Sequence, residues 1–189
     1  MKLSTCFLIV LVMLSFFFSC TPKKDTNQPI ELTDIIKLDN AVENDTIIDS
    51  DYTFNEAIAG TNAPEHVINQ LVLLEVTYLS TDDKLHKGQI ITNEKIADEI
   101  AYMFKLMLEQ NFVVEKAIPV VKYGWSDSLS MEDNNTYSFS YRNVSYSKHA
   151  TGMAIDINPR FNPLKWKKMN KPVQPTGAVS DTTINGTFH

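Results

Sequence analysis

Hydrophobic and polar positions follow two different periods after residue 70. Residues 70–80 (QLVLLEVTYLS) are rich in Val, Leu and Tyr and predict a mostly buried strand. A second short strand is predicted over 88–92, after the polar turn 81–84. From 94 to 111 the apolar residues return at helical spacing, and Asn93 is placed to cap that helix. The apolar stripe expected in the core consists of Ile96, Ile100, Met103, Phe104, Met107 and Leu108.

Two further apolar segments, 117–123 and 152–158, are predicted as strands. Strands on both sides of a helix favour an α+β domain with a small, mostly antiparallel sheet packed against helices. Alternation in the last segment places Met153, Ile155 and Ile157 on one face and Ala154, Asp156 and Asn158 on the other. We therefore expect the Asp156 carboxylate to point away from the apolar layer.

The first twenty residues have a different composition. One Lys precedes an apolar run from Phe7 to Phe18, and Ser19 stands before Cys20. This layout is typical of a secretory signal peptide, with an apolar run short for a membrane span. Its ending resembles a bacterial lipoprotein cleavage site, which implies a lipidated Cys20 that anchors the protein in the cell envelope, facing the periplasm. The alternatives are cleavage elsewhere or an uncleaved anchor.

The remaining sequence predicts a polar, acid-rich tether over 21–51 and a single domain over 52–189. Cys6 and Cys20 are the only cysteines, so the domain after the leader has no disulfide, thiolate metal site or cysteine nucleophile. The net charge of −6, without a basic stripe, argues against a nucleic-acid partner.

His149 and Asp156 are the first candidates for chemistry. Gly152 allows a tight turn between them, and Ala154 leaves space beside the carboxylate. Imidazole and carboxylate are both ligands of Zn²⁺, so the pair indicates a metal site. A His–Asp ion pair, or two unrelated surface residues, are the alternatives that the spacing leaves open.

A longer string around this pair resembles a known family. The segment 147–163 (SKHATGMAIDINPRFNP) is similar to the Ser-x-His-x-x-Gly-x-Ala-x-Asp signature of the zinc D-alanyl-D-alanine carboxypeptidases, a family that includes phage L-alanyl-D-glutamate endolysins. The segment 130–142 resembles a second motif of the endolysin-like branch, matched at Ser130, Met131, Asn134, Asn135, Thr136, Phe139 and Arg142. Residues 78–93 resemble its strand, turn and strand, so the likeness covers about 54–189.

The resemblance implies the fold of that family and a role for each site residue. His149 and Asp156 are two of three zinc ligands, and Arg142 binds and polarises the substrate. Ser147 is implied as a supporting hydrogen-bond partner rather than a nucleophile. Without the motif, Arg142 would be interpreted as a surface salt bridge. The implied function is a zinc metallopeptidase of the envelope that hydrolyses amide bonds in peptidoglycan stem peptides, of the D-Ala-D-Ala carboxypeptidase or L-Ala-D-Glu endopeptidase type.

The sequence departs from the family after Asp156. No later segment matches the motif that supplies the third zinc ligand and the general base, and Asp181 is the only acidic residue that follows. His189 would be an entropically costly ligand at a chain end, and His66 and His86 are expected on the surface. We therefore expect a chain that lacks the family's C-terminal elements, with impaired catalysis. The alternatives are a non-catalytic peptidoglycan-binding lipoprotein or an envelope protein that retains the motif as a relic.

Overall fold

The computed structural model describes residues 45–167 and 171–188. The contacts of the chain divide it into the units Met1–Leu38 and Asp39–His189, and all described residues belong to the second unit. The predicted signal peptide with Cys20, most of the predicted tether, and His189 lie outside the described residues. None of the helices in the described part is both long and apolar enough to span a membrane.

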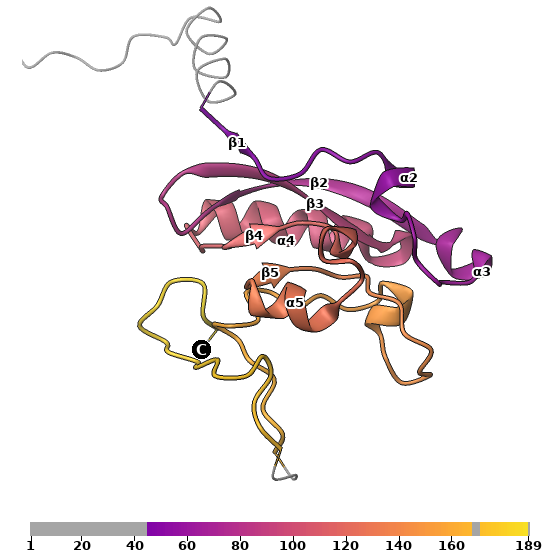
Figure 1. Cartoon of the computed structure of the whole chain (residues 1–189). Coiled ribbons are helices and arrows are strands. Elements are labelled where there is room, and N and C mark those ends of the chain that lie inside the picture. Colours follow the sequence, from indigo (N-terminus) through magenta and orange to yellow (C-terminus); the bar gives the residue numbers. More distant parts are fainter. Residues whose placement is uncertain (1–44, 168–170, 189) are drawn as a thin grey trace, which may run out of the picture. The chain divides into compact units, whose positions relative to one another are not determined.

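A three-stranded sheet forms the centre of the described unit (Figure 1). The strands β2 (Leu71–Leu79) and β3 (Leu85–Asn93) pair antiparallel, with Leu79 opposite Leu85. The short strand β1 (Ile47–Ile48) pairs parallel with the other edge of β3, so the last part of the predicted tether belongs to the sheet. The sheet is therefore mixed, and the predicted α+β class is confirmed.

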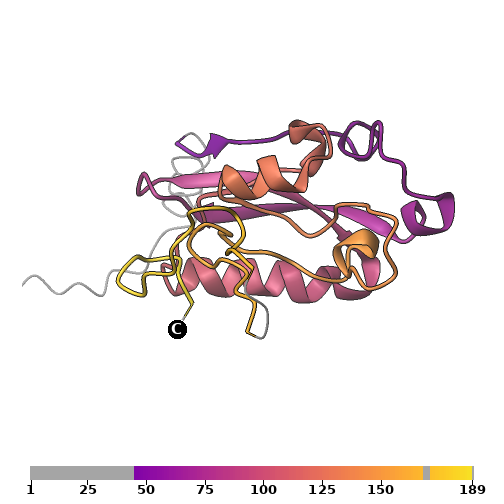
Figure 2. The ribbon, with the colours of Figure 1, turned by 60° about the horizontal axis from the view of Figure 1, so that its bottom comes forward.

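The predicted helix is present and lies along the sheet (Figure 2). It begins as a 3-10 turn, η1 (Glu94–Ile96), and continues as α4 (Ala97–Glu109). The Asn93 side chain accepts the Lys95 backbone N–H at 3.1 Å, as the capping prediction required. The apolar stripe meets β2 in the main core, which consists of Val76, Tyr78, Ile90, Ile100, Phe104, Met107, Val114, Ala117 and Ile157.

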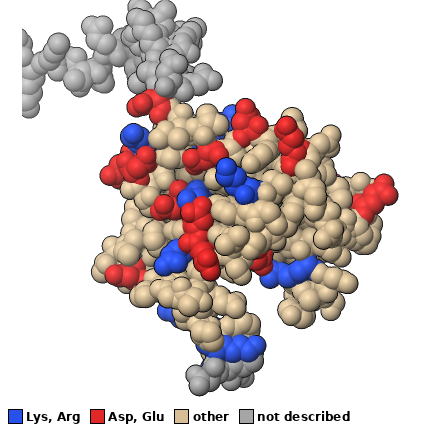
Figure 3. Space-filling model, viewed as in Figure 1, with Lys and Arg blue, Asp and Glu red and all other residues tan. Residues whose placement is uncertain are grey.

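Two short helices, α2 (Phe54–Ala57) and α3 (Glu65–Ile68), lie between β1 and β2. Thr53 and Glu56 form a capping box that begins α2. These helices contribute to a second apolar cluster on the sheet, made of Ala57, Val67, Leu71, Ile91 and Phe139. On the face seen in Figure 3, acidic and basic side chains are intermixed.

The prediction of a strand over 117–123 is wrong, since only residue 117 of this range lies in a strand. A two-residue strand, β4 (Lys116–Ala117), pairs parallel with β5 (Asn135–Thr136), and the chain then turns into the 3-10 helix η2 (Val120–Tyr123). Pro119 explains the change, because proline has no N–H for a sheet ladder. The helix α5 (Asp127–Glu132) follows and leads back to β5.

The strand predicted over 152–158 is also wrong as a regular strand. It is reduced to a single antiparallel bridge between Tyr137 and Asp156. Ile155 and Ile157 pack on the core, and the Asp156 side chain is 40% exposed. These three residues therefore lie on the faces that the alternation predicted. Asn158 was expected beside Asp156 but is fully buried. The cause is its left-handed backbone (φ 43°), which turns the amide inward to the backbone carbonyl of Val113 at 2.7 Å.

His86 is buried rather than on the surface as predicted, with 9% of the residue exposed. Its Nδ1 lies 2.9 Å from Asp49 Oδ2, and its Nε2 lies 3.1 Å from Asp82 Oδ1. The Tyr78 hydroxyl donates to the same Asp49 carboxylate. Both ring nitrogens therefore contact carboxylates, and the contact with Asp49 fastens the end of β1 to the sheet.

The substitution Asp49→Asn should weaken this attachment. It keeps the shape of the side chain but removes the charged acceptor shared by His86 and Tyr78, so we expect the free energy of unfolding to fall by about 2 kcal/mol. Thermal or urea unfolding measures the change. Asp83→Asn removes an equal charge from an exposed turn residue and should leave stability within about 0.5 kcal/mol of the parent. Equal stabilities for both variants would contradict this prediction.

Candidate functional site

The candidate site is built on the carbonyl of Gly152, at the end of β3. This oxygen accepts the Asn93 backbone N–H at 3.0 Å and lies 3.0 Å from the Thr92 hydroxyl and 3.2 Å from the Ser138 hydroxyl. The two hydroxyls are 2.9 Å apart and share their protons among these contacts. The site loop is therefore joined both to β3 and to the segment that follows β5.

Only glycine suits position 152. Its φ of +66° lies in the left-handed region, where a side chain is strained. A Cβ atom would also lie 2.8 Å from the Asn93 backbone nitrogen and 3.0 Å from Leu71 Cδ2. Gly152 ends the 3-10 helix η3 (His149–Thr151), so its close approach to β3 places His149 at the site.

Each of the two predicted ligands is fixed by the segment after β5. His149 Nδ1 lies 2.8 Å from the Ser138 carbonyl oxygen and therefore donates a hydrogen bond to it. Asp156 exchanges two backbone hydrogen bonds with Tyr137, of 3.1 and 2.9 Å. The remaining ring nitrogen, His149 Nε2, then lies 3.4 Å from Asp156 Oδ2, so the structure brings the predicted pair together.

This contact calls for a positive charge. With Nδ1 protonated, a neutral imidazole would direct the Nε2 lone pair at a carboxylate oxygen, and only a proton or a metal cation between them makes the contact favourable. Burial favours the neutral ring, but the Asp156 carboxylate and the Ser138 carbonyl outweigh it, so the pKa of His149 is raised.

The geometry of the pair fits two positions around a single zinc ion. Nitrogen and oxygen ligands at about 2.0–2.1 Å from a tetrahedral zinc lie about 3.3–3.4 Å apart. Fixing one imidazole nitrogen on a carbonyl is also the usual outer-shell arrangement of a zinc-bound histidine. Within residues 45–167 and 171–188, no third His, Cys, Asp or Glu joins them. Among the described residues, this candidate site therefore has two possible protein ligands, where catalytic zinc sites normally have three.

Tyr137 belongs to the candidate site, although no pattern in the sequence indicated it. Its ring centroid lies 5.3 Å from that of His149. Burial and the charge of Asp156 raise the pKa of the Tyr137 phenol, which keeps it neutral and able to donate a hydrogen bond. Tyr137 stands within the segment that resembles the family's second motif, but not at a matched position.

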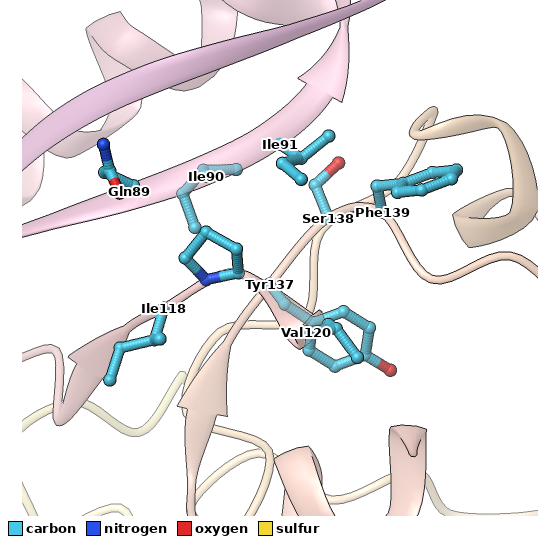
Figure 4. A pocket seen from close by; sticks show the side chains of 9 residues that line it. Gln89, Ile90, Ile91, Ile118, Val120, Tyr137, Ser138 and Phe139 are labelled. Atoms are coloured by element: carbon cyan, nitrogen blue, oxygen red, sulfur yellow. The ribbon is translucent and has the colours of Figure 1, made fainter. Parts of the chain in front are cut away.

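The wall behind Tyr137 and Ser138 is closed to water. The seam between this segment and β3 has no room for a water molecule, and Ile90 and Ile118 are among the residues that line it. Figure 4 shows the Tyr137 ring directed away from β3, with its hydroxyl on the far side from Ile90. The backbone that carries the site therefore packs directly against β3, with no water-sized space between them.

Arg142 forms an ion pair at the N-terminus of α5. Its Nη1 lies 2.5 Å from Asp127 Oδ2, and 41% of the Arg142 side chain remains exposed. The other carboxylate oxygen, Asp127 Oδ1, is buried and has no hydrogen-bond partner among the described residues. The positive charge of Arg142 also acts to lower the pKa of His149, so the two groups lie in the same electrostatic field.

Arg142 thus makes the salt bridge that was its alternative interpretation, and it keeps exposed N–H donors near the site.

Ser147 does not make the supporting contact with His149 that the resemblance implied. Its backbone N–H donates to the Val144 carbonyl at 3.3 Å, and its hydroxyl makes no hydrogen bond within the described part of the chain. The contact that supports His149 comes from Ser138 instead. The sequence also gave no indication of Asp127, because only the fold brings α5 to Arg142.

Comparisons of this chain with protein-family models, with curated proteins and with solved structures found no match.

The raised pKa of His149 can be measured directly. In metal-free protein, an NMR titration of the ring should give a pKa above the ordinary value of about 6.5. The associated stability is fully present below about pH 6.5 and is lost as the pH rises through the raised pKa. Asp156→Asn should bring the pKa down, because it removes the carboxylate that favours the charged ring. A pKa of His149 at or below about 6.5 would contradict the prediction.

The substitution Gly152→Ala tests the anchor of the site. We expect it to lower the free energy of unfolding by at least about 2 kcal/mol, because left-handed strain adds to the overlap with Asn93. Gly177→Ala is a matched control, since Gly177 also has a positive φ (+75°) but no atom within 4 Å of a Cβ there. Its cost should be about 1 kcal/mol. Equal losses in chemical unfolding would show that strain alone, not the close approach, determines the need for glycine.

Proposed function

We propose that this chain is a zinc-dependent peptidase of the cell envelope that hydrolyses amide bonds in peptidoglycan stem peptides. The bond would be of the D-Ala-D-Ala carboxypeptidase or L-Ala-D-Glu endopeptidase type, and a lipidated Cys20 would attach the protein to a membrane. The observation that carries the proposal is the 3.4 Å separation of His149 Nε2 and Asp156 Oδ2, with His149 Nδ1 bound to the Ser138 carbonyl. It supports the ligand roles that the sequence motif implies.

A bound zinc ion would supply a Lewis acid that polarises the scissile carbonyl and acidifies a water molecule. The protein's own residues bind and orient the peptide. Arg142 offers its exposed guanidinium donors to a substrate carboxylate or to the oxygen on which negative charge develops. Asp127 holds that guanidinium in place. Neutral Tyr137, beside His149 and Asp156, is a further hydrogen-bond donor.

A second candidate function has its own support. The described residues contribute only two zinc ligands, and two ligands hold the metal more weakly than three. Arg142 does not depend on the metal for its charge. A non-catalytic, peptidoglycan-binding lipoprotein that recognises stem-peptide carboxylates through Arg142 is therefore the alternative.

Zinc calorimetry of the purified chain tests the site first. We expect one zinc ion per chain, and a loss of affinity of at least about 100-fold in His149→Ala and in Asp156→Asn, because each removes a direct ligand. His66→Ala is the matched control for histidine removal, and Asp83→Asn is the control for loss of a carboxylate. Unchanged zinc binding in His149→Ala would overturn the assignment of the ligands.

Digestion of purified muropeptides then separates the two candidates. Cleavage that stops with a chelator, and that falls with Arg142→Gln, supports the peptidase. Binding without cleavage, unaffected by a chelator but weakened by Arg142→Gln, supports the binding protein. If the chain neither binds nor cleaves the muropeptides, both candidate functions are rejected.

A further inference from the structure

A separate polar cavity lies where β4, the end of α5 and residues 160–161 meet. It has a volume of about 280 Å³ and is lined by Glu115, Lys116, Glu132, Asp133, Asn134, Arg160 and Phe161. A second cavity of about 310 Å³ adjoins it, since Glu115 and Lys116 line both. None of the zinc-site residues lines either cavity. In Figure 3, side chains of both charges are mixed over the face where β4 and α5 lie in Figure 1.

Some charges of the 280 Å³ cavity are already neutralised within the protein. Lys116 Nζ lies 2.8 Å from Asp133 Oδ1, and the Tyr123 hydroxyl donates to Asp133 Oδ2 at 2.8 Å. Glu115, Glu132 and Arg160 are different. Their charged groups form no ion pair or hydrogen bond with any described residue, including one another. Unpaired charges of both signs therefore line one cavity without neutralising each other.

The backbones of Glu115 and Arg160 are fixed. Glu115 donates its N–H to Asn158 Oδ1 at 2.9 Å, and its carbonyl accepts the Ser80 hydroxyl at 2.8 Å. Arg160 donates its N–H to Asn134 Oδ1 at 2.8 Å. A ligand that pairs with both side chains would meet them on a rigid frame, which lowers the entropy that binding costs.

Asn134 lines the same cavity and carries a buried, unpartnered donor. The residue is 5% exposed, and its Nδ2 has no hydrogen-bond partner among the described residues. Leaving a buried donor unpaired is unfavourable, so such a group points to a missing acceptor. Because Asn134 Oδ1 binds the Arg160 backbone, its amide is held next to the residue that carries the free guanidinium.

We propose that this cavity binds the zwitterion of an α-amino acid. The ligand's carboxylate pairs with Arg160 and accepts from Asn134 Nδ2, and its ammonium group pairs with Glu115. A guanidinium and a carboxylate that do not pair with each other match the two charges of such a ligand. The site requires neither zinc nor hydrolysis, so it goes beyond the proposed peptidase and does not rest on it.

The test is an NMR titration of the metal-free chain with alanine. Binding should shift the Asn134 side-chain amide signals together with the Glu115 and Arg160 backbone signals. N-acetylalanine lacks the ammonium charge and alaninamide lacks the carboxylate, so each should bind at least about tenfold more weakly than alanine. Unshifted Asn134 signals, or equal binding of N-acetylalanine, would overturn the proposal.

Variants assign the two halves of the site. Glu115→Gln and Arg160→Gln should each weaken alanine binding at least about tenfold, and Arg160→Lys should recover part of the loss because it restores the charge. Lys105→Gln and Glu109→Gln, on exposed positions of α4, are matched controls that should bind as the parent does. Full binding by Glu115→Gln and Arg160→Gln, with well-dispersed spectra, would reject the site.

Discussion

The arrangement of the whole candidate site depends on one carbonyl group, that of Gly152. Three segments that are distant in sequence meet at this oxygen through Thr92 and Asn93, Ser138, and Gly152 itself. The approach is possible because position 152 has no side chain to separate the loop from β3. The same contact brings the 3-10 helix of His149 beside Ser138, whose carbonyl lies 2.8 Å from His149 Nδ1.

His86 and His149 show how the surroundings of a histidine decide its role. His86 has a carboxylate at each ring nitrogen, so neither nitrogen is open to a further partner. His149 has a carbonyl at one nitrogen and a single carboxylate at the other. That second arrangement leaves one nitrogen available for a cation other than a proton. The difference lies in hydrogen-bond partners rather than in burial, and it makes His149 the candidate ligand.

The polar groups divide into those that neutralise one another and those that do not. Salt bridges join Lys116 to Asp133 and Arg142 to Asp127. The charged groups of Glu115 and Arg160 and the Asn134 amide nitrogen have no such partner within the described protein. Glu115 directly precedes β4, Asn134 lies between α5 and β5, and Arg160 follows the single bridge at Asp156, so none of these three residues stands inside a helix or strand.

The sequence alone determined the elements whose patterns are local. Periodicity gave the hairpin of β2 and β3 and the capped helix α4, and the motif spacing identified His149 and Asp156 as a pair. Tertiary structure decided the rest. Tyr137 and Ser138 joined the site, His86 became buried, and Asn158 turned inward, because each is fixed by hydrogen bonds or ring contacts with residues far away in the chain. Such partners leave no period in the sequence, so only the folded chain specifies them.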